Sequence, residues 1–375
     1  MTTVLGQKAA TTARPSIDPG VRRARPVKIW AAVGALWLSL LVYMWSVWLM
    51  SGDARPSPRG PTPVPHWQEV AARVWEASMV IATIVVAWLV LIRPWVRDRR
   101  ISTDGMLFIA WLTMWMIQDP WANYTQQYFN YNNAFLNLGC PQCHVPGWQS
   151  ANGANMAEPI LFTGGMYLTA LFMGSVVCCA AMRWAKKRWP QMGALGLMTF
   201  AYLFILVIDF GMELPWLRFG LYSYSGSIRE LSFFSGHYYQ FPIYEGLLWG
   251  AAWTSMACLR YFKDDRGNTL AERGVDQIKA PEWQKQGLRL LALIGIANTI
   301  FVVLCNIPTI FMAQHSDAYP DDVLDKSYLT NGMCGLGTDY ACPDPRVPMV
   351  VGHDSVHVTP QGTMSIPAGT PRQVP

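Results

Sequence analysis

The amino-acid sequence predicts an all-α polytopic membrane protein, a bundle of about seven transmembrane helices. Hydrophobic residues make up 52% of the 375 residues and charged residues only 14%, whereas soluble domains carry about 25% charged residues. The 18 tryptophans fit this class because Trp collects at bilayer interfaces. The net charge of +5 is small, and no basic stripe interleaved with aromatic residues indicates a nucleic-acid partner.

Seven apolar segments predict the spans. Each is long enough, or nearly so, to cross about 30 Å of hydrocarbon, and they lie at residues 29–50, 72–92, 104–118, 158–182, 193–214, 241–262 and 288–312. The third is the shortest, and Asn298, Asn306 and Pro308 interrupt the last. The first is too long for the core of a signal peptide and lacks a small-residue cleavage site, so we expect it to remain as a transmembrane helix.

Basic residues at the segment ends predict the orientation. Clusters precede segment one and follow segments two, four and six: Arg22, Arg23, Arg25, Arg93, Arg97, Arg99, Arg100, Arg183, Lys186, Lys187, Arg188, Arg260, Lys263, Arg266 and Arg273. Lys and Arg are retained on the cytoplasmic side. We therefore expect a multi-pass protein of the bacterial cytoplasmic membrane with its N-terminus inside, a disordered basic tail at 1–27, a bundle at 28–312 and an extracytoplasmic tail at 313–375.

Six carboxylates fall at the predicted outer boundary of the bundle: Glu76, Asp119, Glu158, Asp209, Glu213 and Glu245. Ionisable groups in a membrane bundle normally face its interior or a wet cavity. We therefore expect a pocket that opens outward beneath two loops, 119–157 and 215–240. The first of these loops is nearly forty residues long and rich in aromatic residues, as functional loops often are.

Asp209 and Glu213 are the strongest catalytic candidates of this set. They lie four residues apart, and so on one face of a helix, inside an apolar run. Like charges and low dielectric both raise a carboxyl pKa, which would leave one group protonated and able to act as a general acid. A structural polar network between helices is the alternative. Glu76 in headgroups, Asp119 at a helix end and Glu158 at a helix start are the simpler explanations for the other acids.

The stretch 235–245 forms the predicted lip of this pocket. It combines His237, Tyr238, Tyr239 and Tyr244 with Glu245, one turn into the sixth span. A lone loop histidine usually has only a structural role, but the neighbouring phenols and carboxylate make His237 a candidate base.

Four of the eight cysteines, Cys140, Cys143, Cys334 and Cys342, lie in the predicted outer regions. That compartment permits disulfides. The sequence does not determine their pairing, and bridges could hold the C-terminal segment against the 119–157 loop. Residues 140–144 also match the C-x-x-C-H pattern of c-type haem attachment. A disulfide explains the cysteines without haem, and a zinc site using His144 is a further alternative.

The sequence contains no G-x-S-x-G, Walker, dinucleotide-binding or H-E-x-x-H motif. We therefore expect no cofactor and no metal. Acid–base chemistry on a lipophilic small molecule, at the lipid bilayer, fits this pattern.

The chain resembles the avermectin-pathway spirocyclases, the AveC type of membrane protein. The resemblance rests on the segments R-P-W-V-R (93–97), Q-D-P-W-A-N-Y (118–124), V-P-G-W (145–148), G-L-Y-S-Y (220–224), G-H-Y-Y-Q-F-P (236–242), R-Y-F-K-D-D-R-G (260–267) and S-Y-L-T-N-G (327–332). It implies closure of a dihydroxy-ketone polyketide into a spiroketal, with dehydration as a second reaction in some members.

This chemistry suggests roles for the candidate residues. We expect Asp209 or Glu213 to be the acid, Glu245 to stabilise an oxocarbenium ion, and His237 to be the base. The expected substrate-binding residues are Asp119, Asn123, Tyr124, Trp148, Tyr238, Tyr239 and Tyr244. Two other classes remain: a non-catalytic binding or transport protein for an apolar metabolite, and a membrane redox protein with haem at 140–144.

Overall fold

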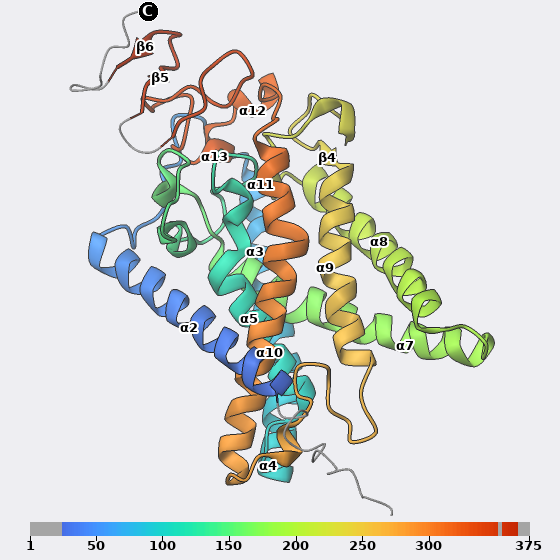
Figure 1. Ribbon diagram of the computed structural model, residues 1–375. Helices are drawn as coiled ribbons and strands as arrows, with labels where there is room; N and C mark the ends of the chain where they lie inside the picture. The colour runs from blue at the N-terminus through green and yellow to red at the C-terminus, as the bar shows by residue number, and fades with distance from the viewer. Residues whose placement is uncertain (1–24, 352–354, 367–375) are drawn as a thin grey trace, which may run out of the picture.

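The computed structural model describes residues 25–351 and 355–366, and helices dominate it (Figure 1). The main helical elements are α2 (Arg25–Ser51), α3 (His66–Ala87), η1 (Trp88–Ile92), α4 (Arg93–Asp98), α5 (Thr103–Gln118), α6 (Ile160–Met166), η5 (Tyr167–Leu171), α7 (Phe172–Arg188), α8 (Ala194–Arg218), α9 (Ile243–Tyr261), α10 (Glu282–Phe301), η8 (Val302–Asn306) and α11 (Ile307–Ala313). Each of the seven predicted segments coincides with one helix or with one uninterrupted run of these elements.

Five helical runs are long and apolar enough to cross a membrane: Pro26–Ser51, His66–Asp98, Ile160–Arg188, Ala194–Arg218 and Glu282–Ala313. The all-α, multi-span class is therefore supported. The two remaining segments form α5, which has only 16 residues, and α9, both of which have most of their residues buried inside the bundle. Seven spans and the orientation of the termini stay predictions. The predicted tail at 1–27 lies outside the described residues except for its last three, which begin α2.

Proline starts many of the helices. Pro65, Pro159, Pro242 and Pro281 immediately precede α3, α6, α9 and α10. Its ring fixes φ near the helical value, and it lacks an N–H group that the first helical turn could not satisfy anyway. The sequence thus sets where these helices begin and where the loops above them end.

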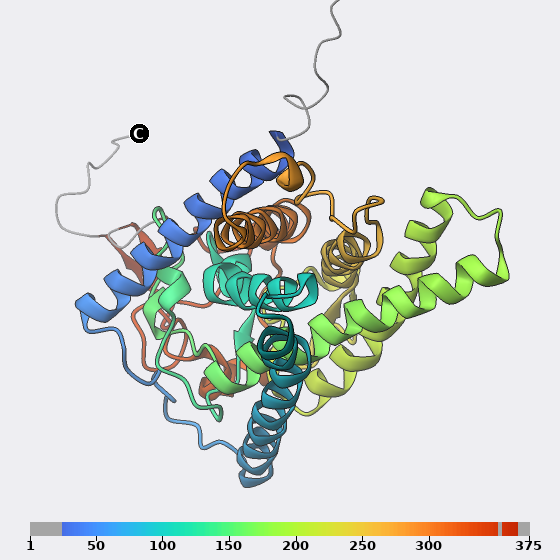
Figure 2. The same ribbon diagram turned by 90° about the horizontal axis from the view of Figure 1, so that it is seen from below.

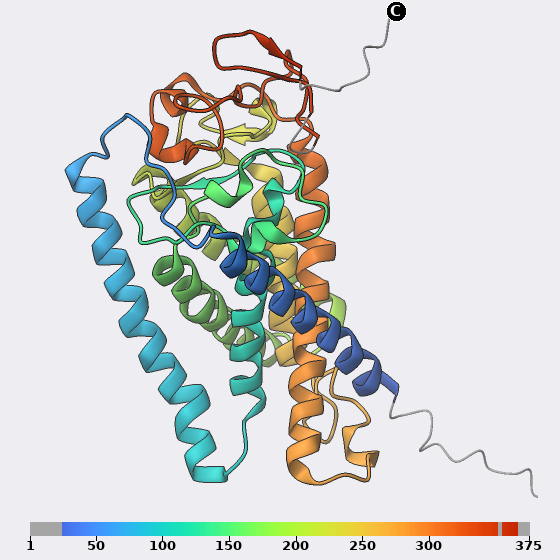
Figure 3. The same ribbon diagram turned by 90° about the vertical axis from the view of Figure 1, so that its left-hand side faces the viewer.

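The helix α2 packs obliquely across α10, as Figure 1 and Figure 3 show. Their backbones touch at Gly34 and Gly295: an added Cβ would lie 1.9 Å from Leu291 O at the first glycine and 2.1 Å from Trp30 O at the second. Small residues permit such close helix approach in membranes. In turn α10 packs on α5, whereas the α7–α8 hairpin extends to one side of the bundle (Figure 2).

The loops and the C-terminal segment gather at one end of the bundle (Figure 3). The shorter elements there are η2 (Asp119–Asn123), β1 (Asn130–Tyr131), η3 (Pro141–His144), η4 (Gly153–Asn155), β2 (Tyr222–Ser223), η6 (Arg229–Leu231), β3 (Ser232–Phe233), β4 (Phe241–Pro242), α12 (Asp321–Leu324), α13 (Ser327–Thr330), β5 (His357–Val358) and β6 (Met364–Ser365). At the other end lies η7 (Val275–Gln277). Strands pair antiparallel as β1–β2, β3–β4 and β5–β6, and the first pair joins the 119–157 loop to the chain after α8.

Buried side chains anchor the 119–157 loop. Glu76, which is 3% exposed, is paired with Arg73 and accepts a hydrogen bond from Leu136 N at 2.6 Å. Arg73 also binds Ala134 O. Glu76 therefore anchors the 119–157 loop to α3. Because the loop covers α3 at this position, the Glu76 side chain is buried and is not exposed to lipid headgroups.

The C-terminal segment packs on the same loop through amides. Asn133 Nδ2 donates to Asn331 Oδ1 at 3.1 Å, and Asn331 Nδ2 donates to Tyr131 O at 2.9 Å. The outer cysteines form two local disulfides, Cys140–Cys143 and Cys334–Cys342. The idea that a disulfide ties the C-terminal segment to the loop is wrong, because hydrogen bonds and packing make that connection.

Candidate functional site

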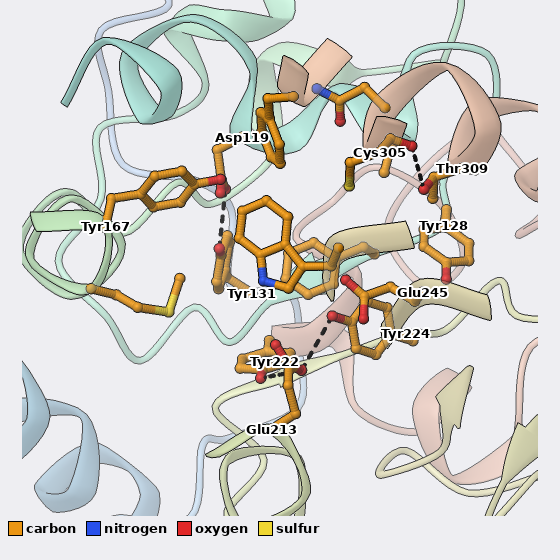
Figure 4. Close-up of a pocket in the computed structure, with 16 residues that line it drawn as sticks. Asp119, Tyr128, Tyr131, Tyr167, Glu213, Tyr222, Tyr224, Glu245, Cys305 and Thr309 are labelled. Atoms are coloured by element: carbon orange, nitrogen blue, oxygen red, sulfur yellow. Dashed lines mark hydrogen bonds between the residues drawn. The ribbon is translucent and has the colours of Figure 1, made fainter. Parts of the chain in front are cut away.

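A cavity of about 70 Å³ lies beneath the loops, in the middle of the helices (Figure 4). Two acidic groups, a ring of phenols and an apolar wall line it: Asp119, Ala122, Tyr128, Phe129, Tyr131, Met166, Tyr167, Glu213, Tyr222, Tyr224, Glu245, Trp249, Phe301, Cys305, Asn306 and Thr309. These residues come from the 119–157 loop, the end of α6 and the start of η5, the chain after α8, and the helical elements α8 to α11. One water molecule needs about 10–15 Å³ by this measure, so the cavity holds a few small polar groups.

The first acidic group consists of Glu213 on α8 and Glu245 on α9. Glu213 Oε2 accepts hydrogen bonds from Tyr222 Oη at 2.6 Å and from Tyr224 Oη at 3.2 Å. Tyr224 also lies within hydrogen-bonding reach of Glu245. Glu245 is 8% exposed, and its Oε2 has no hydrogen-bond partner among the described residues. Because buried polar atoms normally have hydrogen-bond partners, this carboxyl of a cavity-lining residue has unused hydrogen-bonding capacity.

Asp209 lies behind this group on α8. It is fully buried, and neither of its oxygens has a hydrogen-bond partner within the described part of the chain. It is close enough to Glu213 and Glu245 to interact with both electrostatically. It does not line the cavity, so any effect on a substrate passes through its neighbours. An isolated buried carboxylate is costly, which favours the neutral form here.

The second acidic group is Asp119, at the start of η2, with Glu158, two residues before α6. Tyr131 Oη donates to Asp119 Oδ2 at 3.0 Å, and Tyr167 is also within hydrogen-bonding reach of this carboxyl. Glu158 is 1% exposed, accepts from Trp115 Nε1 at 2.6 Å and reaches Asp119 with its carboxyl group. Asp119 keeps some accessible surface because it lines the cavity.

Both acids of this second group have raised pKa values. Burial raises the pKa of Asp119 to about 6, although hydrogen bonds from Tyr167, Tyr131 and Glu158 counteract the shift. Burial and the nearby charge of Asp119 raise the pKa of Glu158 well above its usual range. The two carboxyl groups are therefore expected to share one proton. Burial and the nearby acids also raise the pKa of Tyr131 and of Tyr222, so both phenols remain hydrogen-bond donors.

Local structure explains how these side chains converge. In the β1–β2 ladder Tyr131 lies directly opposite Tyr222, and alternation along β2 places Tyr222 and Tyr224 on the same side. Two π-helical turns, η5 and η8, contribute Tyr167, Cys305 and Asn306. Such turns shift the side chains that follow and are frequent at functional sites.

Three buried amide side chains connect the helices around the cavity. Gln118 Nε2 donates to Asn298 Oδ1 at 2.7 Å, and Asn306 Nδ2 donates to Gln118 Oε1 at 3.0 Å. Asn298, which interrupted the apolar run in the sequence, therefore ties α10 to the end of α5, directly before Asp119.

The structure does not bring His237 to this cavity. Its side chain is 54% exposed, lies 3.6 Å from Asp322 Oδ2 and stacks on Tyr239. Gly236 N donates to Gln240 Oε1, and Gln240 Nε2 donates to Tyr224 O, so residues 236–240 fold outward over β4. Only Glu245 of the stretch 235–245 lines the cavity, so the structure does not support His237 as the base there.

Most of the other predicted substrate-binding residues have structural partners outside the cavity lining. Tyr124 Oη donates to Pro146 O and its ring packs on Trp148, while Tyr238 Oη donates to Arg218 O. Arg218 lies 4.1 Å from the Tyr239 ring centroid.

Asn123 and Tyr244 also lie outside the cavity lining. Asn123 Oδ1 accepts from Tyr128 N at 2.6 Å and from Phe129 N at 2.8 Å, which fixes the turn before β1. Tyr244 Oη accepts from Ile228 N. Asp119 is the one predicted substrate-binding residue that lines the cavity.

The tyrosines that surround the cavity were not identified from the sequence. Tyr128, Tyr131, Tyr167 and Tyr222 line the cavity, and none was among the candidates. The sequence does contain a pattern that indicates two of these tyrosines. Tyr222 and Tyr224 are two residues apart in an extended segment, and this spacing places both side chains on one face. Nothing local in the sequence pairs Tyr131 with Tyr222.

The C-x-x-C-H segment forms η3 at some distance from this chemistry. Cys140 and Cys143 are bonded to each other, so their sulfurs are not free for thioether bonds to haem or for zinc ligation. His144 Nε2 lies 3.0 Å from Asp53 Oδ2, and its Nδ1 lies 3.1 Å from Cys140 O. The segment thus joins the end of α2 to the 119–157 loop.

The fold and the cavity define a class: a helical protein, with five helical runs long and apolar enough to cross a membrane, that encloses a small acidic cavity lined by tyrosines. A comparison with models of protein families identifies the family. The model of the family "Spirocyclase AveC-like" matches residues 98–329, well over half of the chain, and the chain belongs to this family. No protein of curated function and no solved structure matches the chain. The matched region contains every residue that lines the cavity.

Proposed function

We propose that this protein closes a lipophilic dihydroxy-ketone into a spiroketal by acid–base chemistry in the Asp119–Glu213–Glu245 cavity. The observation that carries the proposal is the pair of acidic groups on one small cavity whose other walls are phenols and apolar rings. Membership of the spirocyclase family supports the reaction class. The lipophilic, polyketide-like nature of the substrate follows from the apolar walls and the membrane setting.

The reaction needs two additions and one loss of water. One hydroxyl adds to the ketone to give a hemiketal, the hemiketal hydroxyl leaves as water, and the second hydroxyl adds to the resulting oxocarbenium ion. Overall, a dihydroxy-ketone gives a spiroketal and one water molecule. A general acid must protonate the carbonyl oxygen and then the departing hydroxyl, and a base must take a proton at each addition.

The Glu213–Glu245 group suits the acid and the electrostatic role. Tyr222 and Tyr224 fix Glu213. Glu245 lines the cavity, and its Oε2 has no hydrogen-bond partner among the described residues. A protonated carboxyl of this group can protonate the leaving hydroxyl, and the resulting carboxylate stabilises the oxocarbenium ion. The apolar side chains that line the cavity strengthen the attraction between the carboxylate and the oxocarbenium ion, because they lower the local dielectric constant.

Confinement supplies the rest of the catalysis. Holding both hydroxyls near the carbonyl carbon converts intermolecular encounters into an ordered ring closure and selects one face of attack. The cavity accommodates the reacting carbonyl and its two hydroxyls but not a whole polyketide chain, so the roofing loops must part to admit a substrate.

A direct test supplies the purified protein in lipid nanodiscs with candidate dihydroxy-ketones. We expect faster ring closure than in buffer and a single spiroketal stereoisomer, measured by chiral chromatography with mass detection. Glu213→Gln and Glu245→Gln should each lower the rate by about 10²-fold or more, whereas Glu230→Gln, at an exposed position beside β3, should behave as wild type. Wild-type rates in both Glu213→Gln and Glu245→Gln would contradict the proposal. A bound but unchanged hydroxy-ketone would favour a carrier.

A further inference from the structure

The proposed ring closure needs a base, and His237 is not at the cavity. Asp119, the cavity-lining member of the other acidic group, lies across the cavity from Glu213 (Figure 4). Glu158 is within hydrogen-bonding reach of Asp119. Two carboxyl groups within hydrogen-bonding reach of each other must share a proton, because a pair of carboxylates has only acceptors. The geometry decides which of the two carries it.

The donors around the pair favour a charged Asp119. Asp119 accepts from the phenols of Tyr131 and Tyr167 and from the carboxyl of Glu158. Glu158 receives one N–H, from Trp115 at 2.6 Å, and no N–H or hydroxyl donor among the described residues reaches its Oε2. Hydrogen bonds to the charged form favour ionisation, and burial without them opposes it.

We propose that Asp119 is the base that takes the proton of the attacking hydroxyl, and that protonated Glu158 is a positioning residue that holds Asp119 by a hydrogen bond. This assignment rests on the proposed spiroketal-forming function. It rests on more than an acidic cluster. Asp119 and Glu245 line the same cavity, and the buried carboxyl of Glu245 has an oxygen, Oε2, without a hydrogen-bond partner among the described residues.

The two sides of the cavity then divide the proton transfers. At each addition the substrate O–H bond breaks, a C–O bond forms at the former carbonyl carbon, and the proton passes to Asp119. The Glu213–Glu245 group gives one proton to the carbonyl oxygen and a second to the departing hydroxyl, which leaves as water. Protons return from Asp119 to that group between steps, so no oxidant, reductant or further reactant is consumed.

The surroundings of Asp119 set its pH dependence. The titratable groups that act on it come from five elements or loops: Glu158 before α6, Tyr131 of β1, Tyr167 of η5, Glu213 of α8 and Cys305 of η8. The pKa of Asp119 is about 6. Asp119 must be a carboxylate to act as a base, so kcat/KM should fall as the pH drops through about 6 and level off above it.

Three isosteric or truncating variants test the assignment. Asp119→Asn should lower kcat by about 10²–10⁴-fold, the usual contribution of a general base. Glu158→Gln should stay within about tenfold of wild type, because its amide oxygen can accept from Trp115 while its N–H₂ donates to Asp119. Glu158→Leu removes that donor, so the acidic limb of kcat/KM should move to higher pH.

The outcomes separate this assignment from the proposed function. A wild-type protein that forms no spiroketal overturns both. Spiroketal formation that survives in Asp119→Asn overturns the base alone, and Glu158→Gln as inactive as Asp119→Asn would make Glu158 the reacting group. An acidic limb that does not move in Glu158→Leu would also contradict the pairing.

An infrared measurement tests whether Glu158 is protonated, and it does not depend on catalytic activity. The carboxylic-acid C=O band of Glu158 should be present in wild type and lost in Glu158→Gln. Matched yield and unfolding temperature of the two isosteric variants, with Glu230→Gln as the reference, exclude misfolding as the cause. Absence of the band in wild type would contradict the assignment even if the enzyme is active.

Discussion

Tyr131 and Tyr222 lie directly opposite each other in the β1–β2 ladder, and each donates a hydrogen bond to a different acid: Tyr131 to Asp119 at 3.0 Å, Tyr222 to Glu213 at 2.6 Å. Their ring centroids are 5.9 Å apart. One cross-strand pair therefore fixes the distance between the two acidic groups of the cavity. Because residues opposite each other in a β-ladder lie at a fixed distance, the ladder sets the separation between Asp119 and Glu213.

The Tyr222 hydroxyl is the first test of this arrangement. Tyr222→Phe removes the 2.6 Å donor to Glu213 but keeps the ring. A hydrogen bond to a charged group is worth about 1.5–3 kcal/mol, so we expect about a tenfold to hundredfold loss of spiroketal formation. Tyr202→Phe is the matched control, because that hydroxyl donates to Leu247 O outside the cavity. Equal rates for both variants would contradict the role of Tyr222.

The α2–α10 crossing makes a stability prediction. Gly295→Ala places a Cβ against the backbone oxygen of Trp30 at 2.1 Å, and overpacking of this kind costs about 1–3 kcal/mol. Thermal unfolding in detergent should show a lower midpoint. Gly287→Ala on the same helix has open space around the new Cβ and should unfold at or above the wild-type temperature. The idea fails if the two variants unfold alike.

Glu76 is expected to hold the roof of the cavity. Glu76→Gln weakens the pairing with Arg73 and the bond from Leu136 N, which should cost about 1–3 kcal/mol. Hydrogen exchange should then rise across residues 130–137 before it rises in the helices. Glu69→Gln changes an exposed acid on the same helix, whose partner Arg59 lies 3.4 Å away, and should leave that exchange pattern as in wild type.

The outer cysteines give a chemical prediction. Peptide mapping of the unreduced protein should find the pairs Cys140–Cys143 and Cys334–Cys342, with no bridge between the loop and the C-terminal segment. Each closes a short loop, so Cys140→Ser/Cys143→Ser should lose only about 2 kcal/mol of stability. That variant should retain ring closure, since neither sulfur lines the cavity. A cross-bridge in the map, or loss of catalysis in a folded variant, would contradict this.

The sequence by itself determined the helical class, the segments and the acids. Apolar length located the five helical runs that are long and apolar enough to cross a membrane, because hydropathy is a local property of the chain. The orientation drawn from the basic residues stays a prediction. The rarity of charges within apolar runs also made Asp209, Glu213 and Glu245 visible as candidates, since each is costly there unless it has a partner or a task.

Only the tertiary structure decided what faces the cavity. Tyr131 and Tyr222 are separated by the whole of α6 to α8 along the chain, and it is strand pairing that places them opposite each other. His237 looked like a partner of Glu245 because eight residues separate them, yet β4 turns that loop away from the cavity. Loop side chains take their direction from long-range hydrogen bonds and packing, and these contacts leave no periodic pattern in the sequence.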